Sequence, residues 1–374
     1  MIIASVAILL LLLYALLIAY YYRSWKKLEV PDLDDSIEPN GTLSVLVPAR
    51  NEEKNLPHLV SALKNQSLPA HLFEVLVIDD YSTDKTAQVV HQQAADNIRL
   101  ISPIADASHS SKKKAIESGV LSARGEMIVT TDADCIPGPQ WLETINSFGQ
   151  QKNASFIAAP VAFTTNGSIL ENFQALDFLT LQGITAASVQ AGFHDMCNGA
   201  NLAYRKEAFR AVNGFEGIDQ VATGDDMLLM YKIRKKFPKQ VFYLKHPDAI
   251  VYTSPMESWS AFFMQRKRWA SKSLVYEDFR IIAVLGFIYL LNCWWMVLLV
   301  ASFSNLVYLY SVLGFLLAKA LIEYPFVRSV AIFYRMEKLA PWLFIFQPLH
   351  ILYTVIIGLV SQIGQYEWKG RRTK

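Results

Sequence analysis

The stretch Thr130-Thr131-Asp132-Ala133-Asp134-Cys135 decides how the rest of this chain is interpreted. It follows a short apolar run, Glu126-Met127-Ile128-Val129, which is typical of a buried strand entered from a turn. Asp132 and Asp134 would repel each other and lose hydration there unless a positive charge lies between them. A hard divalent cation supplies that charge and takes its remaining ligands from water and substrate phosphates. The alternative is a pair of solvated turn residues, because Asp-x-Asp is a common pattern.

The residues before this stretch alternate between strands and helices. Short apolar runs predict strands at 43–47, 75–78, 98–102 and 126–129. Helical spacing of apolar residues and available cap residues predict helices at 56–63, 85–94 and 112–123. This alternation predicts an α/β fold, a mostly parallel sheet with flanking helices.

Acidic residues follow three of these strands. Glu52 lies after the first, Asp80 after the second, and Asp132 with Asp134 after the strand that ends at Val129. In such sheets ligands bind beyond the carboxyl ends of the strands. We therefore expect the acidic side chains to form one site at one edge of the sheet.

Further elements follow the Asp-x-Asp stretch. Residues 155–163 and 201–204 are predicted strands, and Gly224-Asp225-Asp226 opens a predicted helix. Between residues 259 and 272, aromatic side chains interleave with basic ones, which is typical of an amphipathic helix at a membrane surface.

Long apolar segments lie near both ends of the sequence. Residues 2–22 carry no charge and are followed by basic residues, which predicts a membrane span with the next segment in the cytoplasm. No residue between 281 and 318 is charged, enough for two spans with a turn near 302–305, and a further span is predicted at 341–363. Lys319 and Glu323, four residues apart, are expected to pair near a membrane end rather than to line a channel.

The overall composition gives no sign of nucleic-acid binding, of a cysteine-based metal site or of a disulfide framework. Hydrophobic residues make up 52% of the 374 residues and charged residues 18%, with a net charge of +2 and no basic stripe that would indicate nucleic-acid binding. The 3 cysteines lie far apart and match neither a metal-binding spacing nor a disulfide framework.

Five motifs occur in a fixed order: Pro48-Ala49-Arg50-Asn51-Glu52, Asp79-Asp80-Tyr81-Ser82-Thr83-Asp84, Asp132-Ala133-Asp134, Gly224-Asp225-Asp226 and Gln265-Arg266-Lys267-Arg268-Trp269. Together they resemble the signature of the family 2 glycosyltransferases, which have a Rossmann-like GT-A fold. The resemblance covers about residues 42–275. It is closest to the membrane-embedded branch that includes cellulose and hyaluronan synthases and ceramide glucosyltransferase.

The resemblance implies a donor site at the acidic edge. The residues expected to bind a nucleotide sugar are Pro48, Ala49, Glu52, Asp79, Asp80, Lys112, Lys113 and Asp132. Asp132 and Asp134 would hold Mg²⁺ or Mn²⁺ on the diphosphate and neutralise the charge of the departing nucleotide. Lys112 or Lys113 would contact the diphosphate, although a solvated charge run at a helix start is the alternative.

The resemblance also implies a catalytic base and an acceptor site. Asp226 would take the proton from the acceptor hydroxyl, and the neighbouring Asp225 would raise its proton affinity by repulsion. An acidic helix start favoured by the helix dipole is the alternative reading. The residues expected on the acceptor or diphosphate side are Gly199, Asn201, Gln265, Arg268 and Trp269. The loop at 197–201 departs from the aromatic-rich synthase version, which leaves the acceptor open.

The resemblance, together with the apolar segments, implies an inverting, metal-dependent glycosyltransferase of the inner cell membrane. It would move a sugar from a nucleotide-diphosphate donor, with UDP expected, to a lipid acceptor. A processive polysaccharide synthase and a non-catalytic nucleotide-sugar binding protein are the alternatives. The expected parts are an N-terminal transmembrane helix at 1–24, a linker at 25–41, a cytoplasmic catalytic domain at 42–255, interfacial helices at 256–280, a C-terminal transmembrane region at 281–364 and a basic tail at 365–374.

Overall fold

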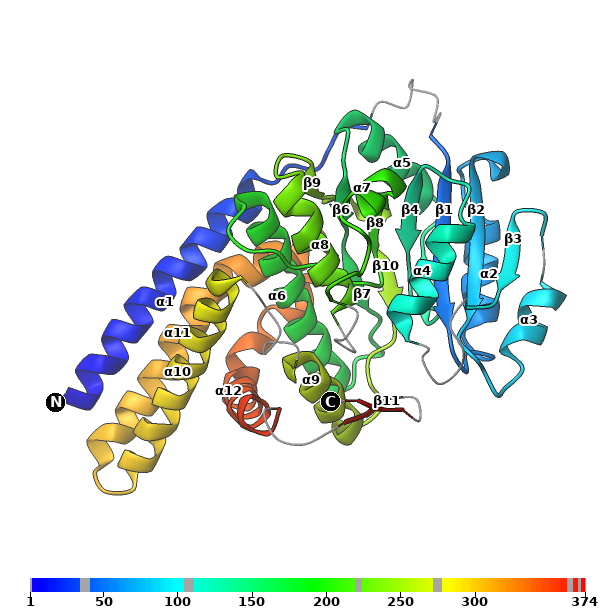
Figure 1. Ribbon diagram of the computed structural model, residues 1–374. Coiled ribbons are helices and arrows are strands. Elements are labelled where there is room, and N and C mark those ends of the chain that lie inside the picture. The colour runs from blue at the N-terminus through cyan, green and yellow to red at the C-terminus, as the bar shows by residue number, and fades with distance from the viewer. Residues whose placement is uncertain are drawn as a thin grey trace. The chain divides into compact units, whose positions relative to one another are not determined.

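The computed structural model describes residues 2–33, 41–93, 95–103, 111–218, 224–271, 278–361, 366–368 and 371–373. Parts of the predicted linker, of the interfacial segment and of the basic tail lie outside these residues, as does Ala94. The chain divides into two compact units (Figure 1). The sheet unit is Glu29–Thr164 with Asp195–Ser254, and the helical unit is Met1–Leu28, Thr165–His194 and Pro255–Lys374.

A seven-stranded sheet with the order β3-β2-β1-β4-β8-β6-β9 forms the centre of the sheet unit. β8 runs antiparallel to both of its neighbours, and the other adjacent pairs are parallel. The prediction of a mostly parallel sheet is therefore confirmed. The strands are β1 (Leu43–Ala49), β2 (Phe73–Asp79), β3 (Ile98–Ile101), β4 (Met127–Thr130), β6 (Phe156–Ala158), β8 (Leu202–Arg205) and β9 (Val241–Tyr243).

A second, smaller sheet has the order β5-β10-β7, formed by Cys135–Pro137, Val251–Thr253 and Val161–Phe163. The helices of the sheet unit are α2 (Leu56–Lys64), α3 (Thr86–Gln92), α4 (Lys112–Ser122), α5 (Trp141–Gln151), α7 (Lys206–Ala211) and α8 (Asp225–Lys236), with 3₁₀ turns η1 (Ala70–Leu72) and η2 (Pro247–Ala249).

The order of connections explains where a ligand can bind. The chain runs from β1 through α2 to β2 and through α3 to β3, then returns through α4 to β4 on the other side of β1. Crossovers between parallel strands are right-handed, so this reversal puts α4 on the face opposite α2 and α3. α4 packs closely on β1 and β2, because a side chain at Gly119 would meet Leu46 and Ile78. The reversal creates a switch point between β1 and β4, the usual ligand position in such sheets.

The helical unit contains α1 (Ile2–Lys27), α6 (Ile169–Ala191), α9 (Trp259–Ser271), α10 (Phe279–Ser302), α11 (Leu306–Phe333) and α12 (Trp342–Val360), with η4 (Glu337–Leu339) and the short strands β11 (Tyr366–Trp368) and β12 (Arg371–Thr373). Among the described residues, α1, α10, α11 and α12 are long and apolar enough to cross a membrane. Large apolar side chains such as Leu16, Val300 and Leu359 remain exposed on them. Apolar residues on both the buried and the exposed sides are expected of helices that face lipid.

Helix α6 was not predicted from the sequence. It begins at a Ser168 cap, whose hydroxyl accepts the Glu171 N–H, and ends at Gly192 in a left-handed conformation. It packs against α1, α11 and α12. Its contact with α11 is close, since a Cβ at Gly183 would lie 2.5 Å from Val330. The range 42–255, predicted as one catalytic domain, thus contains a helix that belongs to the compact unit of the apolar helices.

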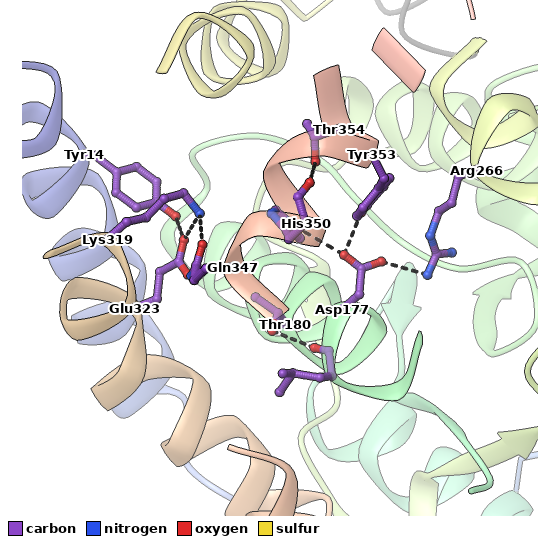
Figure 2. A network of polar contacts seen from close by, with 11 residues as sticks. Tyr14, Asp177, Thr180, Arg266, Lys319, Glu323, Gln347, His350, Tyr353 and Thr354 are labelled. Atoms are coloured by element: carbon purple, nitrogen blue, oxygen red, sulfur yellow. Dashed lines mark hydrogen bonds and ion pairs between the residues drawn. The ribbon is translucent and has the colours of Figure 1, made fainter. Parts of the chain in front are cut away.

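Lys319 and Glu323 form the predicted pair within α11, with 2.6 Å between Nζ and Oε1. Both side chains are buried, and Gln347 of α12 and Tyr14 of α1 complete the cluster (Figure 2). Removing charge from water is costly unless the charges are paired and hydrogen-bonded, and all four side chains serve that purpose. The pair lies in the middle of α11 rather than near its end. In that position it connects the apolar helices α1, α11 and α12.

Candidate active site at the carboxyl edge of the sheet

One backbone hydrogen bond and one from a side chain join the loops after β1 and β2. The strands pair in register so that Ala49 lies opposite Asp79. The Asp80 N–H then donates to the Ala49 carbonyl at 2.8 Å, and Arg50 Nη1 donates to the Asp80 carbonyl at 2.8 Å. Pro48 lies one residue earlier on β1. The residues of these two loops that were predicted to bind the nucleotide sugar therefore lie together at the edge of the sheet.

Glu52 is held in the same corner. Its carboxylate accepts a hydrogen bond from Asn55 Nδ2 at 2.7 Å, and its N–H donates to Thr86 Oγ1 at 2.8 Å. Asn51 and Tyr81, one in each loop, adopt positive φ angles of 56° and 58°. Such conformations are costly for these residue types and persist where the surrounding contacts fix them, often at binding sites.

The third acidic loop follows β4 and lies beside them. The Thr131 N–H donates to the Leu46 carbonyl of β1, and Thr130 Oγ1 donates to the Gly199 carbonyl. Asp132 is partly exposed at 38% of its side chain, and Asp134 is exposed. The two carboxylates thus reach solvent, while the two residues just before them are anchored to β1 and to the loop that carries Gly199.

Lys112, at the start of α4, is the cation of this site. Its Nζ lies 2.6 Å from Asp132 Oδ1 and 3.8 Å from Asp225 Oδ2. Burial by itself would lower the pKa of Lys112, but the carboxylates of Asp132, Asp225 and Asp226 outweigh it and raise the pKa above its ordinary value. Lys113 instead donates to the Ile218 carbonyl. The structure thus brings Lys112, and not Lys113, to the carboxylates.

Asp226 lies at the start of α8, held by two backbone groups. Its Oδ2 accepts from the Gly199 N–H at 3.0 Å, and its Oδ1 accepts from the Met227 N–H at 2.8 Å. Gly224 enters the helix with a φ of 78°, a conformation that favours glycine. A Cβ at Gly199 would lie 3.3 Å from Lys112 Nζ and 3.6 Å from Asp226 Oδ2, so glycine permits the close approach of both.

Asp132 and Asp134 are expected to hold a divalent cation only as part of a larger ligand set. Across the described residues, no group of three or more His, Cys, Asp or Glu side chains is arranged to hold a metal by itself. Two carboxylates, water and substrate phosphates together are a usual environment for Mg²⁺. Burial and the charges of Asp134 and Asp132 raise the pKa of the neighbouring Cys135 thiol well above the ordinary value.

Asn201, which was expected on the acceptor or diphosphate side, is held by buried hydrogen bonds. Its side chain is fully buried, accepts from Trp141 Nε1 at 3.0 Å and donates to the carbonyls of Pro160 and Ala249, both at 2.7 Å. These bonds join the loop before β8 to three other segments. Asn201 therefore supports the site from behind, while Gly199 of the same loop contacts Asp226.

The motif residues Gln265, Arg268 and Trp269 lie on α9, in the helical unit. All three are partly exposed, and Trp269 packs against Phe178 of α6 with ring centroids 5.8 Å apart. Four of the five sequence motifs are thus gathered in the sheet unit. The fifth is part of a separate aromatic and ionic cluster.

Sequence reasoning missed two residues that bind the loops together, Arg50 and Thr130. Arg50 lies inside the first motif, but its pairing with the Asp80 carbonyl depends on the strand register. Thr130 ends β4, and its bond to Gly199 depends on β8 lying next to β4. The order of strands in the sheet was the missing information in both cases.

The family comparison agrees with this geometry. Residues 44–212 match the model of a family described as "Glycosyl transferase family 2". This range includes β1 to β4, β8 and the loops that carry Glu52, Asp80 and Asp132. This part of the chain is therefore similar to the family 2 glycosyltransferases.

Comparisons with individual proteins support the same domain. The chain is 23% identical to the probable glycosyltransferase YdaM of Bacillus subtilis (strain 168) over 255 residues, 67% of this chain and 59% of the relative. It is 35% identical to the dolichyl-phosphate beta-glucosyltransferase of Homo sapiens over 119 residues, 29% of this chain and 35% of the relative. The chain thus spans about a third to three-fifths of the length of these curated relatives.

A solved structure shows the same fold over nearly the whole chain. It is the mannosyltransferase PcManGT from Pyrobaculum calidifontis in complex with GDP-Man and Mn²⁺. The superposition has a TM-score of 0.58 at 18% identity and covers 96% of this chain and 100% of the other. The expectation of a GT-A fold is confirmed.

Proposed function

We propose that this protein is an inverting glycosyltransferase that moves a sugar from a nucleotide-diphosphate sugar to a membrane lipid. The observation that carries the proposal is the gathering of Lys112, Asp132, Asp225 and Asp226 beside the switch point of the sheet. A pure structural role would not explain three carboxylates around one lysine at the position where sheets of this class bind ligands.

The donor half of the site is formed by the loops after β1, β2 and β4. We assign the contacts to the nucleoside to Glu52 and Asp80, with UDP as the nucleotide. Lys112 is placed to pair with the diphosphate once it leaves the Asp132 carboxylate. Asp132 and Asp134 would hold Mg²⁺ or Mn²⁺, which stabilises the negative charge of the departing diphosphate when it is bound.

Asp226 is the general base of the proposed transfer. It removes the proton from the acceptor hydroxyl as the hydroxyl oxygen bonds to the anomeric carbon. The bond from that carbon to the diphosphate breaks, and its electron pair leaves with the nucleotide diphosphate. The N–H groups of Gly199 and Met227 fix the orientation of the carboxylate before the acceptor arrives.

A lipid acceptor is favoured over a growing polysaccharide. One relative is named for dolichyl phosphate, a lipid, as its substrate, and four helices of this chain are candidate membrane spans. A conduit for a hydrated polymer must offer partners to its hydroxyl groups. The charged pair in the middle of α11 is already satisfied by Tyr14 and Gln347. We place the sheet unit in the cytoplasm, next to the inner membrane, with Gln265, Arg268 and Trp269 on the acceptor or diphosphate side.

The test uses the full chain purified into lipid nanodiscs. UDP and GDP sugars are screened with Mg²⁺ or Mn²⁺ and a lipid extract, released nucleotide diphosphate is measured, and the product is sized. A discrete glycolipid is expected, and its formation should require Asp134, because Asp134→Ala removes one of the two metal carboxylates. Long polysaccharide would establish a processive synthase instead. Nucleotide-sugar binding without release under any condition would establish a binding protein.

A further inference from the structure

A second ionic cluster lies in the helical unit, apart from the Lys319–Glu323 pair (Figure 2). Asp177 of α6 pairs with Arg266 of α9, with 2.8 Å between Oδ2 and Nη2, and both side chains are only 4% exposed. The other oxygen of Asp177 accepts from the Tyr353 hydroxyl at 2.7 Å and lies 3.5 Å from His350 Nε2. One buried carboxylate thus joins α6, α9 and α12.

Two residues beside this carboxylate, Arg266 and Phe178, pack against the indole ring of Trp269. The Arg266 guanidinium carbon lies 4.3 Å from the centroid of the Trp269 ring, within range of a cation–π interaction. Phe178, the residue after Asp177, packs against the Trp269 ring with centroids 5.8 Å apart. Two consecutive residues of α6 therefore act on Trp269, Phe178 by direct contact and Asp177 through Arg266.

The surroundings of Asp177 favour the charged form of its carboxylate. Burial by itself would raise the pKa of Asp177, but Arg266, His350 and Tyr353 together lower it to about 2. A buried ion pair is a weak source of stability, since apolar residues of similar volume often serve as well. An arginine that stacks on an aromatic ring also fixes its direction, which a lysine or an apolar residue does not do. Orientation of the ring therefore explains the pair better than stability alone.

We propose that Asp177 is a positioning residue that orients Trp269, through Arg266, for the acceptor lipid. The acceptor role of Trp269 rests on the proposed function, whereas the link from Asp177 to Trp269 does not. Because Tyr353 and His350 also contact Asp177, the orientation of Trp269 is coupled to the membrane segment α12.

The test compares three variants of the full chain in nanodiscs. Asp177→Asn keeps the shape but leaves the Arg266 charge unpaired. The double variant Asp177→Asn with Arg266→Met removes both charges, which should recover the thermal stability that the single variant loses. Glu323→Gln is the matched control, because it removes a buried carboxylate of the helical unit that pairs with Lys319 rather than with Arg266.

Two readouts separate orientation from stability. Incorporated 5-fluorotryptophan gives a ¹⁹F resonance for Trp269, assigned with Trp269→Phe. We expect this resonance to shift in Asp177→Asn and in the double variant, but not in Glu323→Gln. The KM for the acceptor lipid should rise about tenfold or more in the first two, with the donor KM unchanged, because misplaced binding groups cost at least that much.

Different outcomes contradict different claims. If the double variant recovers both the Trp269 resonance and the acceptor KM, or if Glu323→Gln shifts the resonance equally, Asp177 has only a structural role. If Asp177→Asn does not fold, the double variant still decides the question. If the wild-type protein transfers no sugar, the proposed function fails while the ¹⁹F resonance still tests the link between Asp177 and Trp269.

Discussion

Lys112 shows how a single side chain can organise an acidic site before a substrate is bound. Its ammonium group lies against Asp132 and near Asp225, so it offsets repulsion that would otherwise push the two loops apart. A bound diphosphate would bring its own negative charge and compete with Asp132 for the same lysine. Lys112 is therefore expected to pair with Asp132 in the free protein and with the diphosphate in the bound protein.

Replacing Lys112 by Met tests this role. The variant keeps the length of the side chain but loses the charge, and a hydrogen bond to a charged group is worth about 1.5–3 kcal/mol. We expect the affinity for the nucleotide sugar to fall by about tenfold or more, measured by calorimetry. Lys114→Met is the control, since Lys114 is in the same run of lysines but pairs with Glu117. Equal weakening in both variants would show a general charge effect.

Asp226→Asn tests the assignment of the base. An asparagine keeps the shape of the side chain and can still accept a hydrogen bond from Gly199, so nucleotide binding should be unchanged. Transfer should fall by about 10²–10⁴-fold, the usual contribution of a general base. Single-turnover measurements with saturating donor will separate the two effects. A rate near that of the wild type would mean that another group takes the proton.

Among the helices and strands, the sequence predicted those features that a local residue pattern determines. It did not predict features that depend on which elements pack next to each other. The acidic loops were found because parallel strands end at one edge of a sheet. The choice between Lys112 and Lys113 needed the exact face of α4 toward β4. Helix α6 was missed because it is buried on most sides, which removes the periodic contrast between polar and apolar residues.

The segment 155–163 illustrates the limit of pattern alone. Its residues are apolar and were predicted as strand, yet β6 and β7 are separate strands that pair in different sheets. Pro160 lies between them, and proline cannot donate to a strand ladder. Its carbonyl instead accepts from Asn201. Only the positions of the neighbouring strands determine which sheet each half joins.

Asn201→Ala separates a structural role of this side chain from its expected contact with the acceptor. The change leaves the Trp141 indole N–H and the Ala249 carbonyl without their Asn201 partner in a buried region, while the Pro160 carbonyl keeps the Val251 N–H. We expect the free energy of unfolding to fall by about 2–4 kcal/mol, measured as a lower midpoint of unfolding in urea. The acceptor KM of the folded fraction should not change. Unaltered stability with a raised acceptor KM would restore the original expectation.

For the molecule as a whole, the helical unit depends on polar side chains that join distant segments of the chain. Trp25 of α1 donates to Ser329 of α11 at 3.0 Å, and Trp294 of α10 donates to the Ile3 carbonyl at 3.1 Å. His194, just after α6, lies 2.7 Å from the Tyr21 hydroxyl of α1. The N-terminal helix is thus fixed by contacts that no local sequence pattern predicts, because their partners are up to 309 residues apart.

His194 should make the stability of this unit depend on pH. The side chain is 2% exposed, and burial lowers its pKa from 6.5 to about 4, with Asp278 acting in the opposite direction. The unfolded chain therefore binds a proton below pH 6.5 that the folded chain does not, so stability must fall as the pH drops from 6.5 toward 4. At 1.36 kcal/mol per pKa unit, the loss between pH 6.5 and 5 is about 2 kcal/mol. Urea unfolding at several pH values will measure the slope, and His194→Asn should remove it. The same slope in both proteins would assign it to other groups.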